Sequence, residues 1–157
     1  MLPRQQRRSF LGRIGGLSAW IAGLVAGVIP ASPARADRNV AAFDAKAIDD
    51  ALAAAGVLDA TESEAVILRA PDIAENSALV HVEIESRLPD TSSILLFAER
   101  NPQPFVAQFN FLSGAEPFVA VRIKMAESAH LRAVVRAGDG VYFARRETRV
   151  TLGGCAG

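Results

Sequence analysis

Cysteine is almost absent from this chain. Its 157 residues include one cysteine, one tryptophan, one tyrosine and two histidines. A single cysteine excludes an internal disulfide framework and cannot supply the thiolates of a structural zinc site. The two histidines, His81 and His130, are far apart in the sequence and lack the spacing of metal ligands. We interpret them as cross-strand or surface residues and expect neither a metal nor another resident cofactor.

Lysine is also scarce, and the charges are unevenly distributed. The formal net charge is zero, from 17 basic and 17 acidic residues. Five arginines and no acidic residue occur in residues 1–36, so the remainder holds 12 basic residues against 17 acidic ones, a formal charge of −5. An acidic domain whose only lysines are Lys46 and Lys124 is poorly suited to binding a phosphate backbone. We therefore expect no nucleic-acid partner.

The first 36 residues have the three parts of a secretory signal. Arg7-Arg8 precedes Ser-Phe-Leu, an apolar stretch follows over 14–29, and Ala34-Arg35-Ala36 forms a small-x-small cleavage motif. The paired arginines predict twin-arginine export, cleavage after Ala36 and a bacterial periplasmic protein. An uncleaved membrane anchor is the alternative, although the apolar stretch is shorter than the ~20 residues that cross a bilayer. We expect no membrane association after cleavage.

The mature chain is predicted to begin with one short helix. Residues 41–55 are rich in alanine, and Gly56 is a natural stop. Within this stretch Phe43, Ile48 and Leu52 are expected to form a single apolar face.

After the helix, the chain changes to short runs rich in valine, isoleucine and phenylalanine, separated by turn residues. Seven runs are expected as strands, near residues 65–68, 79–85, 94–97, 105–111, 118–125, 131–136 and 141–152. This number and spacing of runs are typical of a β-sandwich. We predict an all-β, immunoglobulin-like domain over 37–152, with most of its phenylalanines packed between the sheets.

Titratable residues do not form a catalytic cluster in the sequence. Glu83 and Glu85 are two residues apart and share one face of a predicted strand, which we interpret as solvent or partner surface. Arg145, Arg146 and Arg149 form a small basic group, interpreted as solvated charge or as a guide for an anionic substrate or partner. The sequence therefore predicts no catalytic residues.

The last five residues, 153–157, differ from the rest of the chain. The only cysteine, Cys155, stands third from the C-terminus and follows Gly153 and Gly154, which weaken continuation of the preceding strand. Three links beyond Leu152, at ~3.5 Å each, carry its sulfur up to about 10 Å past the sheet. In an oxidising compartment a lone thiol pairs with another molecule or carries a substrate, and a persulfide is one reversible state of such a thiol. We predict a flexible arm over 153–157 with Cys155 as a covalent attachment site; a tail without a role is the alternative.

These features together resemble the SoxY family, the sulfur-carrying subunits of the bacterial thiosulfate-oxidising (Sox) system. The similar parts are the leader, the first helix, the segment 71–76 and above all the junction 150–155. The resemblance implies an immunoglobulin-like fold, a heterodimer with a SoxZ-like subunit that has no leader, and thiosulfate-derived sulfur held on Cys155. It also implies transient partners: the haem-containing SoxXA, which conjugates thiosulfate to the cysteine, SoxB, which releases sulfate, and a sulfane dehydrogenase as a further candidate.

The C-terminal segment departs from the family at one position. The family tail usually reads Gly-Gly-Cys-Gly-Gly, whereas this chain has Ala156 followed by Gly157. Because alanine resists positive φ, Ala156 narrows the conformations of the predicted arm, but we expect the carrier role to survive. A non-catalytic periplasmic binding or adaptor module is the alternative function. A cysteine-nucleophile enzyme is a third possibility that lacks a base near the tail in sequence.

Overall fold

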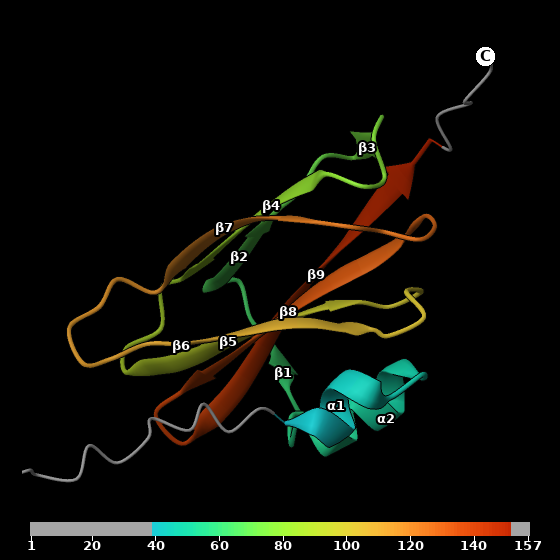
Figure 1. Ribbon diagram of the computed structural model, residues 1–157. Coiled ribbons are helices and arrows are strands. Elements are labelled where there is room, and N and C mark those ends of the chain that lie inside the picture. Colours follow the sequence, from blue (N-terminus) through green and yellow to red (C-terminus); the bar gives the residue numbers. More distant parts are fainter. Residues whose placement is uncertain (1–38, 152–157) are drawn as a thin grey trace, which may run out of the picture. The chain divides into compact units, whose positions relative to one another are not determined.

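The computed structural model describes residues 39–151 (Figure 1). The predicted signal peptide, its cleavage site and the segment 153–157 lie outside the described residues. For those parts the expectations above stay predictions.

Two β-sheets make up most of the described chain. Their strands are β1 (Thr61–Glu62), β2 (Val66–Arg69), β3 (Ile73–Ala74), β4 (Val80–Ser86), β5 (Thr91–Ala98), β6 (Phe105–Asn110), β7 (Phe118–Ile123), β8 (Ala129–Ala137) and β9 (Gly140–Val150). One sheet has the order β1-β9-β8-β5-β6, with β3 also paired to β9, and the other has the order β2-β4-β7. The long strands pair antiparallel, whereas β1 and β3 run parallel to β9. This confirms the predicted immunoglobulin-like sandwich.

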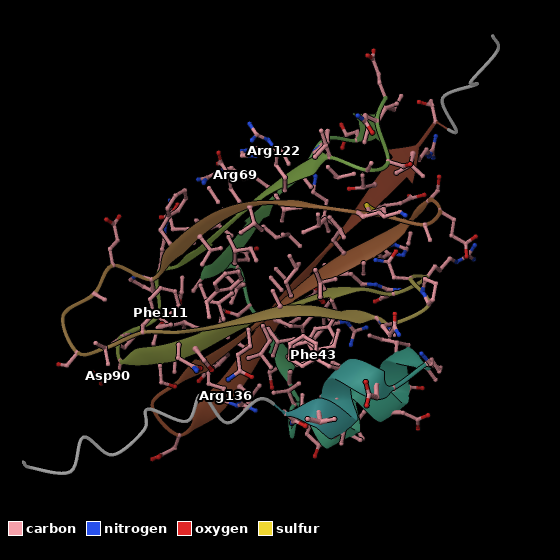
Figure 2. All side chains as sticks on the ribbon, in the orientation of Figure 1. Phe43, Arg69, Asp90, Phe111, Arg122 and Arg136 are labelled. Carbon is pink, nitrogen blue, oxygen red and sulfur yellow. The ribbon has the colours of Figure 1, made fainter. Side chains whose placement is uncertain are left out.

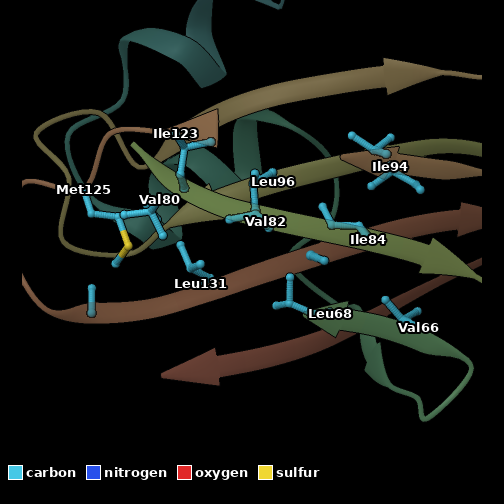
Figure 3. Packing of buried hydrophobic residues seen from close by; sticks show 14 of the residues in the cluster. Val66, Leu68, Val80, Val82, Ile84, Ile94, Leu96, Ile123, Met125 and Leu131 are labelled. Atoms are coloured by element: carbon cyan, nitrogen blue, oxygen red, sulfur yellow. The ribbon is translucent and has the colours of Figure 1, made fainter. Parts of the chain in front are cut away.

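The main core lies between the two sheets because the strands alternate. In β4 the side chains of Val80, Val82 and Ile84 are buried, while His81 on the opposite face is exposed. Their partners across the core come from the large sheet and include Leu96, which is fully buried (Figure 3). Interdigitation of two such inner faces is what holds a sandwich together.

Two helices stand where one was predicted. They are α1 (Val40–Asp44) and α2 (Ile48–Ala54), so the expectation of a single helix over 41–55 was wrong. On a continuous helix Phe43 and Ile48, five residues apart, would point about 140° away from each other. The backbone turns out of the helix at Ala45, with ψ of 142°, and both residues then pack on one cluster. Burial of both side chains therefore outweighs helix continuity.

The helices cover the outer face of the large sheet with a second, smaller core (Figure 1). Phe105 stacks on Phe43 at 4.3 Å and on Phe97 at 4.8 Å between ring centroids. The predicted packing of phenylalanines between the sheets applies to Phe109 and Phe111, whereas Phe43 of α1 and Phe97 and Phe105 of the large sheet belong to the second core. The large sheet is therefore apolar on both faces.

Candidate functional site at the root of the C-terminal segment

The predicted site residues Gly153, Gly154, Cys155, Ala156 and Gly157 lie beyond the described chain, which ends at Thr151. The structure does describe the end of β9 and Thr151, after which this segment of the sequence follows. Four links separate Thr151 from Cys155, a reach of up to about 14 Å at ~3.5 Å per link.

One edge of the end of β9 is held by β3. The backbone N–H of Arg149 donates to the carbonyl oxygen of Asp72 at 2.9 Å, and the N–H of Thr151 donates to that of Ala74 at 3.1 Å. The Thr151 hydroxyl also lies 3.4 Å from the carbonyl oxygens of Ala74 and Glu75. Because alternate N–H groups of a strand point to the same edge, these contacts fix one side of the chain up to its last described residue.

The other edge is held by one serine side chain. The backbone pairing of β8 with β9 ends at Ala129 opposite Thr148. Beyond that pair the N–H of Val150 donates to Oγ of Ser128 at 3.0 Å, and the Ser128 hydroxyl lies 3.4 Å from the Val150 carbonyl oxygen. The hydroxyl thus replaces a backbone partner that β8 no longer provides. We call Asp72, Ala74 and Ser128 the root clamp.

The loops around the root clamp are also tied to each other. Asn101, in the connection between β5 and β6, donates from Nδ2 to the Lys124 carbonyl oxygen and accepts from the Ala126 N–H, both at 2.8 Å. These two contacts lie just before Ser128 in the connection between β7 and β8. Asn101 thus holds the connection that leads to Ser128, although no sequence pattern marks this residue.

The three arginines that precede the root do not form one basic group. Arg145 donates to the Glu99 carboxylate at 2.6 Å, and Arg146 donates to that of Asp72 at 2.7 Å. Arg149 lies 3.6 Å from the Glu147 carboxylate. Since β9 is a strand, Arg146 points to the opposite face from Arg145 and Arg149. Pairing of each arginine with a carboxylate agrees with the interpretation as surface charge rather than as an anion guide.

Glu83 and Glu85 lie on the outer face of the small sheet, as predicted. Arg69 on the neighbouring strand, labelled in Figure 2, lies 3.8 Å from the Glu83 carboxylate and 3.2 Å from that of Glu85. Arg87 lies 3.1 Å from the Glu85 carboxylate. Hydrogen bonds from Arg87 and then Arg69 hold the pKa of Glu85 below its ordinary value. A carboxylate kept ionised by two guanidinium groups is not a proton donor, which supports the surface interpretation.

The histidines are separated by the fold. His81 belongs to β4 in the small sheet and His130 to β8 in the large sheet. His81 Nε2 lies 3.2 Å from the Glu83 carboxylate. Over residues 39–151, no group of three or more histidine, cysteine, aspartate or glutamate side chains is arranged to hold a metal ion. No helix in this part of the chain is long and apolar enough to span a membrane.

Comparison with known proteins places the chain in a family. Its residues 52–155 match the family described as sulfur oxidation protein SoxY. The structure of the sulfur carrier protein SoxY from Chlorobium limicola f thiosulfatophilum is 42% identical with a TM-score of 0.61, and the match covers 69% of this chain and 96% of that one. A superoxide reductase (neelaredoxin) from Ignicoccus hospitalis is 21% identical with a TM-score of 0.49, covering 67% and 93%, which is too low to bear on function. No curated protein matches significantly. The family match and the Chlorobium structure together show that the chain belongs to the SoxY family.

Proposed function

We propose that this protein is a covalent sulfur carrier, with thiosulfate-derived sulfur attached to Cys155. The observation that carries this proposal is the extent of the family match, which runs through residue 155 and so includes the only cysteine of the chain. The Chlorobium relative is itself described as a sulfur carrier protein. In this proposal the protein is not an enzyme, and the catalysis belongs to its partners.

The chemistry expected at Cys155 consists of one oxidation and one hydrolysis. The Cys155 thiolate and the outer sulfur of thiosulfate form an S–S bond, and a haem-containing SoxXA-type partner would accept the two electrons released. Water then attacks the sulfonate sulfur in a SoxB-type partner, which releases sulfate and protons and leaves a persulfide on Cys155. Further oxidation of this persulfide is assigned to a sulfane dehydrogenase.

Gly153 and Gly154 are assigned the role of conformational joints in the carrier arm, Gly153–Gly157. Glycine adopts positive and negative φ with similar ease, so the joints would let one thiol enter active sites of different shape. Ala156 follows Cys155 where the family tail usually has a glycine, so it would narrow the backbone conformations on the C-terminal side of the cysteine. The sulfur on Cys155 is the only group the protein is proposed to carry, with no separate cofactor.

We also propose binding partners and a cellular location for the protein. A SoxZ-like subunit forms a heterodimer with the chain, and SoxXA, SoxB and a sulfane dehydrogenase bind transiently. The twin-arginine pattern of residues 1–36 supports export to the periplasm as a folded complex.

The mass of the intact mature protein from thiosulfate-grown cells, measured before and after a reductant, tests the carrier function. We expect reductant-labile additions that correspond to sulfane sulfur or thiosulfonate and that are lost in Cys155→Ser. The same mass gives the cleavage site. In a reconstituted Sox system Cys155→Ser should abolish thiosulfate-dependent turnover while folding and partner binding persist. Full activity of Cys155→Ser, or of a chain lacking Gly153–Gly157, would instead favour the adaptor module.

A further inference from the structure

We propose that Ser128 is a positioning residue that sets the length of unpaired chain between the end of β9 and Cys155 in the carrier arm. It does so by completing the root clamp on the edge of β9 that β8 leaves unpaired. This inference rests on the proposed carrier function of Cys155. It adds that the point at which the arm begins is fixed by a side chain outside the C-terminal segment.

The hydrogen bonds at the root alternate between the two edges of β9. The N–H groups of Arg149 and Thr151 donate to β3 and its flanking residue Asp72, and the N–H of Val150 between them donates to Ser128. On the β8 side the last backbone pair lies two residues earlier, at Thr148. Without the Ser128 hydroxyl, residues 149–151 would keep only the bonds of Arg149 and Thr151 on the β3 edge, and β3 is itself a two-residue strand. A strand paired on one edge by so short a partner frays readily.

The position of the root determines the length of chain that a partner enzyme must accommodate. With the clamp closed, the segment from the root to the thiol is residues 152–155. If the pairing opens back to Thr148, the segment is residues 149–155, and its reach grows from about 14 Å to about 25 Å. The effective concentration of a tethered group falls roughly as the −3/2 power of tether length once the tether exceeds the required span. Opening the clamp should therefore lower the concentration of Cys155 at a docked active site by about twofold.

Ser128 is suited to substitution because it is exposed and, within residues 39–151, its hydroxyl bonds only to the backbone of Val150. Ser128→Ala removes the hydroxyl and leaves the fold's core untouched. Ser128→Thr keeps the hydroxyl and serves as the conservative variant. Ser92→Ala is the matched control, since the Ser92 hydroxyl donates to the Arg136 carbonyl oxygen at 3.3 Å near the start of β5, far from the root in the sheet.

The first measurement is amide hydrogen exchange of the full mature chain. We expect the Val150 and Thr151 N–H groups to exchange about three- to tenfold faster in Ser128→Ala, which is the effect of losing one net hydrogen bond. Ser128→Thr and Ser92→Ala should exchange like the wild type at both positions. Unchanged exchange at Val150 in Ser128→Ala would overturn the inference.

The second measurement is thiosulfate conjugation to the carrier by a haem-containing SoxXA-type enzyme. We expect kcat/KM to fall in Ser128→Ala, with the loss of about twofold for a fully open clamp as the limit, and to be restored in Ser128→Thr, because tether length controls delivery of the thiol. The reaction of Cys155 with a small soluble disulfide should not change, since such a reagent needs no tether of defined length.

Insertion of two glycines after Leu152 separates arm length from any other effect of Ser128. This variant should lower kcat/KM to a similar extent while the Val150 and Thr151 amides exchange at the wild-type rate. An unchanged kcat/KM in the insertion variant, or in Ser128→Ala with faster exchange, would overturn the proposed link between root and delivery. Conjugation that persists in Cys155→Ser would instead overturn the carrier function itself.

Discussion

The outer faces of the two sheets are built in opposite ways. The large sheet is covered by α1 and α2, and Phe43 of α1 stacks on Phe105, which in turn stacks on Phe97. The small sheet instead presents ion-paired arginine and glutamate side chains around Arg69, which Figure 2 labels. Apolar burial stabilises a fold by kilocalories for each large side chain, but exposed ion pairs contribute little. The difference indicates that, besides the main core between the sheets, the helix-covered face stabilises the domain, whereas the ionic face contributes little to its stability.

The largest expected effect comes from Phe97 on the helix-covered face. Phe97 is fully buried and stacks on Phe105, so Phe97→Ala should lower the free energy of unfolding by about 3–5 kcal/mol. Phe118 on the outer face of the small sheet is 42% exposed and provides the matched control. Phe118→Ala should cost less than about 1 kcal/mol, because much of its ring already contacts water. Urea unfolding of both variants measures the comparison, and equal losses would contradict the proposed division between the faces.

A smaller effect is expected where the helices are attached to each other. Oδ1 of Asn39 accepts a hydrogen bond from the Ala42 N–H at 3.1 Å, and its Nδ2 donates to the Ala54 carbonyl oxygen at 2.7 Å. Asn39→Ala removes both the cap of α1 and the link to the end of α2, so it should cost about 1–2 kcal/mol, measured by urea unfolding.

Asn39→Asp separates the two roles, because a carboxylate can cap α1 but cannot donate to Ala54. Its loss of unfolding free energy should fall between those of the wild type and Asn39→Ala. A loss in Asn39→Asp as large as in Asn39→Ala would show that the link to α2, rather than the cap, provides the stabilisation.

The pattern of the sequence was sufficient to predict the long strands but not the short ones. The seven predicted runs all correspond to strands, since alternation in β4 and continuous apolar residues in β5 are visible locally. The two-residue strands β1 and β3 form by backbone pairing to β9, which leaves no periodic signal. The break at Ala45 was missed because it depends on a surface that Phe43 and Ile48 share only in the fold.

The residues of the candidate site also differ in whether the sequence alone could identify them. Cys155 could be chosen from the sequence because it is the only cysteine and has glycine before it. Ser128 could not be chosen, because its partner Val150 is 22 residues away and a serine in a loop has no distinctive pattern. The segment 71–76 was noted only for its family resemblance, and its pairing with β9 gives that segment a physical role at the root.

The smallest expected effect lies on the ionic face, at Glu85. Its folded-state pKa is depressed below the ordinary 4.5 by Arg87 and Arg69, so its ion pairs stabilise the fold above that pH and the stabilisation is lost as the pH falls through the depressed pKa. Glu85→Gln should therefore be slightly less stable than the wild type at neutral pH, and the difference should vanish in acid and shrink in high salt. Glu116→Gln is the control, since the structure gives that exposed carboxylate no ion pair among residues 39–151. Urea midpoints measured across pH decide the outcome. A large, salt-independent loss in Glu85→Gln would mean that the ionic face also holds the domain together, and the contrast between the two faces would fail.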